Sequence, residues 1–171
     1  MATLVVLRHA QAVAAGAGPD HARVLTPTGE EQARALGEAL RRRGLVPDVV
    51  VTSDAARTRR TTELVVGGDD WPVEVDPDVY EASPSRLAAV LENRGADAGV
   101  TVLVCHEPGA SGLAIALAGP SAAPEAQRLR AEVLSGLGTA EAAVLQWDGD
   151  LAELSPAAAQ LVDVVRPDET T

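Results

Sequence analysis

The chain has 171 residues, with 14 basic and 25 acidic side chains that give a formal net charge of −11. Hydrophobic residues make up 46% of the sequence and charged residues 23%, which argues for one folded domain and against a disordered or fibrous chain. The excess of acidic residues also argues against a nucleic-acid-binding protein, because such a protein needs a basic face.

The cysteine count and the apolar runs bear on the compartment. Cys105 is the single cysteine, so an intrachain disulfide and a multi-cysteine metal site are excluded. Residues 1–7 are apolar but lack a basic segment and stop at Arg8, which is unlike a signal peptide. No apolar run approaches the ~20 residues needed to cross a bilayer. We therefore expect a soluble, cytoplasmic protein that has neither a membrane nor a nucleic acid as partner.

Short apolar, β-branched runs alternate along the chain with longer stretches of Ala, Leu, Arg and Glu. This alternation predicts an α/β fold of three layers, a mainly parallel central sheet with helices on both faces. Strands are expected at 4–7, 48–52, 73–75 and 100–104. Helices are expected at 27–43, from 53 or 54 to 66, at 84–93 with Gly95 just beyond, at 110–118 and at 124–134.

The remaining segments are assigned from turn and cap signals. Residues 12–20 read as a loop, and Thr26 caps the following helix, which has Pro27 at its first position. Ser53 or Asp54 is expected to cap the next helix. Residues 142–147 and 151–154 flank an Asp-Gly-Asp segment, which predicts a hairpin. The last apolar segment is 161–165, so we assign one domain to residues 1–165 and a charged tail to 166–171.

Ionisable residues follow three of the predicted strands. Arg8 and His9 follow the first, and His106 follows the strand at 100–104. Arg57 lies one turn into the helix after the strand at 48–52. Taken singly, such a His is more often structural and such an Arg more often solvated. Because ligands of parallel sheets bind outside the carboxyl ends of the strands, the joint pattern predicts a site for a compact anion such as phosphate.

Four segments carry recognisable motifs. Residues 4–10, LVVLRHA, contain R-H-(A/G); residues 23–33, RVLTPTGEEQA, match R-x-L-T-x-x-G-x-x-Q-A. Residues 53–63, SDAARTRRTTE, are similar to S-P-x-x-R-T-x-Q-T-A-E, and residues 102–109, VLVCHEPG, to a strand leading into G-H-N-P-G. In this order they resemble the histidine phosphatase superfamily, also called the phosphoglycerate mutase-like family, over about residues 3–165. The likeness is greatest to its SixA branch of phosphohistidine phosphatases.

The resemblance implies a phosphoglycerate mutase-like fold with a minimal cap, and a phosphatase that uses neither a metal nor a cofactor. His9 would be the nucleophile that carries the phosphoryl group. Arg8, Arg57 and His106 would clamp the phosphoryl oxygens, and Arg23 would help to hold the substrate phosphate.

The general acid is left open by the resemblance. Glu81 occupies the best placed position, although it is equally well read as an ordinary capping or surface acid. Glu107 stands where the family has Asn, so it would raise the pKa of His106, oppose an incoming phosphate or serve as a substitute acid. Alternatively it points outward in the first turn of a helix. Cys105 replaces a Gly and is expected to be a buried, inert thiol.

The substrate is inferred from the short connection between residues 75 and 100, which leaves room for one helix and no large cap. An open crevice would admit a phosphohistidine side chain of a partner protein. The alternatives are a phosphatase of small phosphate monoesters or nucleotides and, less favoured, a non-catalytic phosphate-binding module. The sequence does not indicate the oligomeric state.

Overall fold

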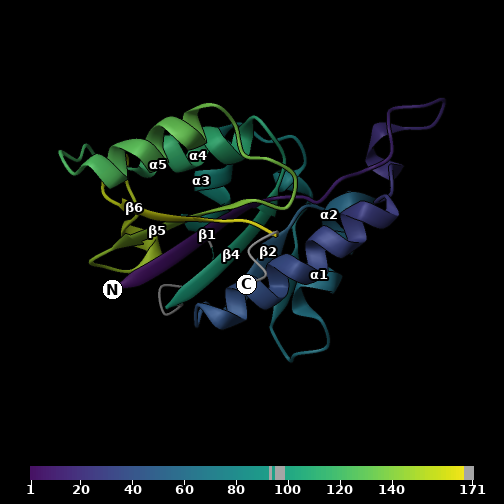
Figure 1. The fold of residues 1–171 in the computed structure, drawn as a ribbon, viewed down its shortest axis with the longest axis horizontal. Helices are drawn as coiled ribbons and strands as arrows, with labels where there is room; N and C mark the ends of the chain where they lie inside the picture. Colours follow the sequence, from purple (N-terminus) through teal and green to yellow (C-terminus); the bar gives the residue numbers. More distant parts are fainter. Residues whose placement is uncertain (93, 95–98, 168–171) are drawn as a thin grey trace.

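The computed structural model describes residues 1–92, 94 and 99–167, and these form an α/β fold around a six-stranded sheet (Figure 1). The sheet order is β3-β2-β4-β1-β5-β6; the first four strands are parallel, and β5 is antiparallel to both of its neighbours, β1 and β6. The strands are β1 Ala2–Arg8, β2 Val49–Thr52, β3 Val73–Val75, β4 Val100–Cys105, β5 Ala142–Trp147 and β6 Gln160–Val165. The helices are α1 Pro27–Arg42, α2 Ala56–Val66, α3 Pro84–Glu92, α4 Gly109–Leu117 and α5 Pro124–Leu134.

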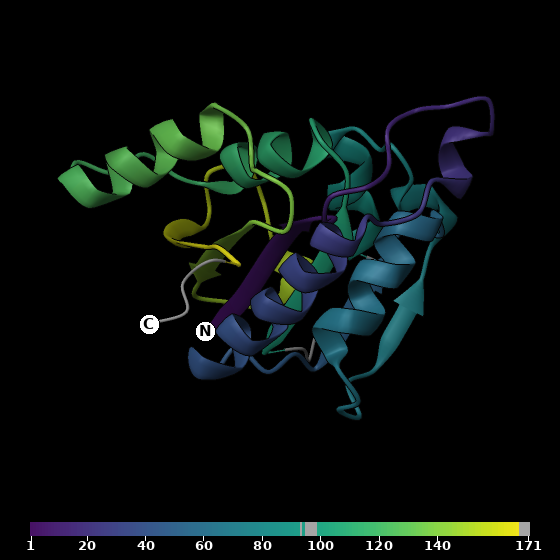
Figure 2. The ribbon, with the colours of Figure 1, turned by 45° about the vertical axis from the view of Figure 1, so that its right-hand side comes forward.

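Helices cover both faces of the sheet, which confirms the predicted three layers (Figures 1 and 2). Alternate residues of a strand point to opposite faces, so the apolar run of β1 divides between two cores. Leu4 and Val6 pack in the core beneath α3, α4 and α5. Val5 and Leu7 pack in the core beneath α1 and α2. None of the described helices is both long and apolar enough to traverse a lipid bilayer.

The start of α1 is fixed against the segment that follows β1. Thr26 is the N-cap, as predicted, and its hydroxyl accepts a hydrogen bond from the Gly29 amide at 3.0 Å. A side chain at Gly29 would collide with the carbonyl oxygen of Gln11, so this glycine permits the close approach. The Thr26 amide in turn donates to that carbonyl at 3.0 Å. These contacts therefore hold the first turn of α1 against Gln11, two residues after His9.

Two local predictions are wrong. Neither Ser53 nor Asp54 caps α2; its N-cap is Ala55, whose amide donates to the Ser53 hydroxyl at 3.2 Å. The predicted hairpin partner of β5 is instead the 3-10 turn Leu151–Glu153, and β5 pairs with β6. The turn forms because the Glu153 carboxylate accepts from the amide of residue 150 at 3.2 Å and Leu151 enters the core.

The structure does not describe every predicted boundary. Helix α3 begins at Pro84 as expected and is described to Glu92, while its expected end at Asn93 and the following Gly95 lie outside the described residues. The same holds for positions 168–171 of the expected tail. Leu87, Val90 and Leu91 are the buried residues of α3, as predicted.

Candidate active site

The carboxyl ends of β1, β2 and β4 align at one edge of the sheet. Arg8 of β1 is in register with Cys105 of β4, and Thr52 of β2 with Val104 of β4. The His9 amide continues the ladder to the Cys105 carbonyl at 3.1 Å. Because the three strands end side by side, the residues that follow them in the sequence share one site.

Arg57 joins the two histidines of this site. Its Nε donates to Nε2 of His9 at 3.2 Å, and its Nη2 donates to Nδ1 of His106 at 3.2 Å. The two imidazole ring centroids are 5.3 Å apart. All three residues are buried. The structure thus brings together side chains that lie 48 and 49 residues apart in the sequence.

His9 is held as a neutral ring with one nitrogen free of a proton. Its Nδ1 lies 2.8 Å from the Ala10 carbonyl, which can only accept, so Nδ1 carries the proton and Nε2 the lone pair. Burial, together with the charges of Arg57 and Arg8, lowers the pKa of His9 from 6.5 to about 4. The Ala10 amide donates to the Thr61 hydroxyl at 3.0 Å and fixes this segment to α2. At neutral pH the ring therefore presents a nucleophilic nitrogen.

His106 lies in a similar environment. Its Nδ1 accepts from Arg57, so Nε2 carries the proton and donates to the Ser53 hydroxyl at 3.0 Å. Burial, and next the charge of Arg57, lowers the pKa of His106 to about 3. The expectation that Glu107 raises this pKa is wrong.

Glu107 is hydrogen-bonded to residues outside the pair of imidazoles. Its carboxylate accepts from the Ser111 hydroxyl, one turn further along α4, and from the Leu137 amide at 2.9 Å. It is half-buried by these contacts and does not point outward into solvent. Arg8 donates through Nη1 to the Leu137 carbonyl at 2.7 Å. Glu107 and Arg8 therefore hold the same residue from two sides.

Arg8 retains a buried donor for a ligand. Its Nε is buried and has no hydrogen-bond acceptor among the described residues. A buried donor without an acceptor costs about 1–3 kcal/mol, a cost that a bound oxyanion would remove. With Arg57 and the two imidazoles nearby, this arrangement suits the planar, bidentate recognition of phosphate oxygens.

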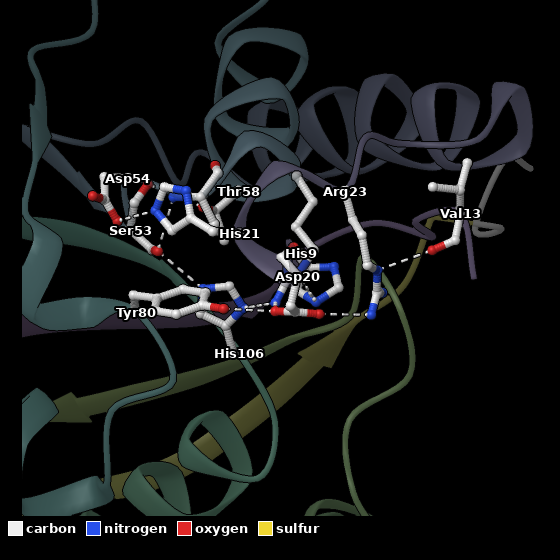
Figure 3. A network of polar contacts seen from close by, with 12 residues as sticks. His9, Val13, Asp20, His21, Arg23, Ser53, Asp54, Thr58, Tyr80 and His106 are labelled. Atoms are coloured by element: carbon white, nitrogen blue, oxygen red, sulfur yellow. Dashed lines mark hydrogen bonds and ion pairs between the residues drawn. The ribbon is translucent and has the colours of Figure 1, made fainter. Parts of the chain in front are cut away.

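Asp20 and Tyr80 belong to the site, and the sequence analysis missed both (Figure 3). The Asp20 carboxylate accepts from Arg57 Nη2 at 3.0 Å, from Arg23 Nη1 at 2.9 Å and from the Tyr80 hydroxyl at 2.7 Å. The Tyr80 hydrogen bond first, and then Arg57, lowers the pKa of Asp20 to about 2. The sequence offered one signal for Asp20: it lies three residues before Arg23, in the segment that leads into the motif at residues 23–33.

The remaining predicted residues lie around this network. Arg23 reaches the site through Asp20, and its Nε also donates to the Val13 carbonyl at 3.0 Å. Glu81 is exposed on the loop next to Tyr80 with a φ of 47°. The Asp20 hydrogen bond raises the pKa of Tyr80, and the charge of Glu81 adds to this effect. Cys105 is fully buried, and burial raises the pKa of its thiol, as fits an inert side chain.

Comparisons with known proteins agree with this picture. Residues 4–106 match the sequence profile of the histidine phosphatase superfamily (branch 1). The uncharacterised protein Rv1276c of Mycobacterium tuberculosis is 33% identical over 156 residues, which cover 91% of this chain and 96% of the relative. A protein of Nakamurella multipartitia that bears the name phosphohistidine phosphatase SixA is 32% identical, with a TM-score of 0.84 over 98% of this chain and 96% of its own.

A second solved structure extends the likeness of fold. The protein histidine phosphatase SixA, solved with tungstate, has a TM-score of 0.76 at 19% identity over 96% of this chain and 97% of its own. The sheet with its cationic site at the strand ends defines a phosphatase of the phosphoglycerate mutase-like fold. The chain belongs to the histidine phosphatase superfamily.

Proposed function

We propose that the protein is a metal-independent phosphohistidine phosphatase in which His9 carries the phosphoryl group. The observation that supports this most directly is the state of His9: a neutral, buried ring whose Nε2 lone pair faces the Arg57 guanidinium. An imidazole in this state attacks phosphorus without first losing a proton. The oxyanion that forms around phosphorus lies within reach of fixed cationic donors.

The reaction then follows in two steps. The Nε2 lone pair of His9 forms a bond to phosphorus while the bond to the leaving group breaks, and water later hydrolyses the phosphoryl-His9 intermediate. Arg8 and Arg57 hold the phosphoryl oxygens by charge, and His106 contributes its ring beside them. Phosphoryl transfer requires positioning and charge stabilisation above all. We expect the loss of one such donor to cost about 10²–10³ in rate.

A protein substrate is favoured by the open side of the site. Between β3 and β4 the described residues contain a 3-10 turn, Pro77–Val79, and helix α3. The apolar side of α3 packs against α4 over one face of the sheet, and we infer that this helix leaves His9 accessible to a substrate. The name of the Nakamurella protein points to the same substrate class. Phosphate monoesters and nucleotides are the alternative substrates.

A substrate panel tests the proposal. We expect kcat/KM for a phosphohistidine-bearing protein to exceed that for sugar phosphates and nucleotides, and a chelator to leave the rate unchanged. Incubation with acetyl phosphate should label His9, and His9→Ala should abolish turnover while the circular dichroism spectrum stays the same. Phosphate release by His9→Ala at the wild-type rate would rule out the mechanism. Faster turnover of a nucleotide than of the phosphoprotein would favour a phosphatase of small phosphate esters. Binding of phosphate without turnover of any substrate would favour a non-catalytic phosphate-binding module.

Glu81 is the proposed general acid for ester substrates, because it lies on the exposed loop beside Tyr80, on the side from which substrate enters. An alkyl ester needs a proton on its leaving oxygen, so Glu81→Gln should lower kcat for glycerol phosphate more than Glu107→Gln does. If neither substitution slows this ester, neither carboxylate is the acid.

A further inference from the structure

Asp20 lies between the buried residues of the site, Arg57 and His9, which we call its floor, and the solvent. The side chain of Arg57 is 4% exposed and that of Asp20 is 38% exposed, although the two are 3.0 Å apart. His9 is on the buried side. Because the attacking and leaving groups lie roughly in line across phosphorus, a group displaced by His9 departs on the solvent side. It therefore leaves past Asp20.

Neighbouring side chains hold the Asp20 carboxylate in place and keep it charged. Tyr80 and Arg23 bind it from opposite sides at 2.7 and 2.9 Å, as Figure 3 shows. The pKa of Asp20 is about 2, chiefly because of the Tyr80 hydrogen bond. At neutral pH the carboxylate is therefore an acceptor and has no proton to donate.

An aromatic wall stands beside this carboxylate. The Tyr80 ring meets the His106 ring edge-on with centroids 5.4 Å apart, and the His21 ring at 4.9 Å. A flat, positively charged ring that lies against this wall also lies beside the carboxylate, and both groups attract cations. A leaving group that becomes negative is repelled by the same carboxylate.

We propose that Asp20 is a specificity-determining residue that selects substrates whose phosphoryl group is carried by a protonated imidazole ring, by accepting a hydrogen bond from the ring nitrogen that does not carry phosphorus. This inference rests on the proposed function and adds to it the residue that separates phosphohistidine from phosphate esters. Tyr80 and Arg23 are positioning residues for the carboxylate.

The transfer step needs no added proton for such a substrate. The bond from His9 Nε2 to phosphorus forms, and the electron pair of the breaking P–N bond returns to the ring nitrogen of the substrate. The protonated ring thereby leaves as neutral imidazole, with its remaining N–H still directed at Asp20. An ester leaves as an alkoxide unless it receives a proton, which the ionised Asp20 does not supply.

The competing interpretation is that Asp20 only holds Arg57 and Arg23 in place. The two interpretations differ in one measurable quantity, the ratio of kcat/KM for an N-phosphoryl substrate to that for an ester. A residue that only positions the guanidinium groups affects both substrates by the same factor, whereas a residue that contacts the leaving group changes the ratio.

The test uses N-phosphoimidazole and p-nitrophenyl phosphate with full-length Asp20→Asn. This substitution keeps the size of the side chain and one acceptor oxygen, and it replaces the charge and the second acceptor with an amide NH2 group. We expect the ratio to fall about tenfold or more, the scale of one charge-assisted hydrogen bond. Asp20→Glu keeps the charge and should retain most of the preference. Asp69→Asn is the matched control, since Asp69 is also bonded to an arginine, Arg41 at 2.7 Å, beyond the far end of α2.

The outcomes separate this inference from the proposed function. An equal loss on both substrates in Asp20→Asn, with Asp69→Asn at the wild-type ratio, overturns the inference and leaves the phosphohistidine phosphatase intact. A wild-type protein that turns over the ester but not N-phosphoimidazole overturns both. A lower ratio in Asp20→Asn, together with a ratio close to that of wild type in Asp20→Glu, supports the assignment.

Discussion

Arg57 organises the site because a guanidinium has donors on all its nitrogens in one rigid plane. Nε reaches His9, Nη2 reaches both His106 and Asp20, and Nη1 donates to the Asp20 main-chain carbonyl at 2.8 Å. A lysine has a single ammonium group and could not hold these partners apart in the same geometry. Arg57 therefore determines the orientation of both imidazoles while its own charge disfavours their protonation.

Burial first, and the charge of Arg57 second, lead to a prediction for the two imidazoles. With pKa values near 4 for His9 and near 3 for His106, neither ring should gain a proton between pH 8 and pH 5 in the free protein. Nuclear magnetic resonance of histidine-labelled protein measures this directly, with His9→Asn and His106→Asn providing the assignments. A titration midpoint near 6.5, the unperturbed value, for either ring would contradict the burial argument.

The buried residues of the site were easier to predict from the sequence than Asp20 and Tyr80, which lie nearer its surface. Arg8, His9 and His106 follow strands, and the position of a strand end in a parallel sheet is set by the sheet itself. Asp20 and Tyr80 come from two loops whose meeting depends on packing between distant segments, 60 residues apart. No local pattern encodes such a contact. The orientation of Glu107 was missed for a related reason, since its partner Leu137 lies 30 residues away.

At the scale of elements, the first turn of α4 packs directly on the loop that carries Tyr80 and Glu81. A side chain at Gly109 would collide with the carbonyl oxygen of Ala82. Helix α4 also begins next to His106, whose carbonyl accepts from the Ala110 amide at 2.9 Å. The contact at Gly109 therefore sets the distance between the floor of the site and its aromatic wall.

We expect Gly109→Ala to lower the free energy of unfolding by about 1–3 kcal/mol, the usual cost of overpacking, and to lower kcat/KM because the Tyr80 loop shifts. Urea denaturation and steady-state kinetics measure the two effects. Gly18→Ala is the matched control, because the space around Gly18 is open, and it should change neither quantity appreciably. Wild-type stability and activity in Gly109→Ala would show that this contact is dispensable.

The elements themselves were predictable where one signal dominated. The β4 run is buried along five of its six residues, and α5 has the bounds expected from its Pro124 start. The hairpin after β5 failed because an Asp-Gly-Asp turn is compatible with more than one continuation. Which one forms was decided by the burial of Leu151 and by the pairing of β6 with β5, both of which are tertiary effects.

On the scale of the whole molecule, a chain with a net charge of −11 buries the imidazoles of His9 and His106 among positive groups. Burial of a neutral histidine links folding to pH. The unfolded chain binds a proton to each such ring below about pH 6.5, whereas folded His9 does so only near pH 4. Between these values the unfolded state holds more protons, so the free energy of unfolding must fall as the pH falls.

We therefore expect His9 alone to remove about 3 kcal/mol of stability between pH 7 and pH 4, from a pKa difference of about 2.5 at ~1.4 kcal/mol per unit. Other groups titrate in the same range, so the measurement is the difference between wild type and His9→Asn in urea denaturation at a series of pH values. The loss from Asp20 comes lower, between its ordinary pKa of 3.8 and about 2, because its carboxylate is stabilising only while ionised. A His9→Asn protein whose stability declines as steeply as that of wild type between pH 6.5 and pH 4 would show that His9 is not the neutral, buried base on which the proposed mechanism depends.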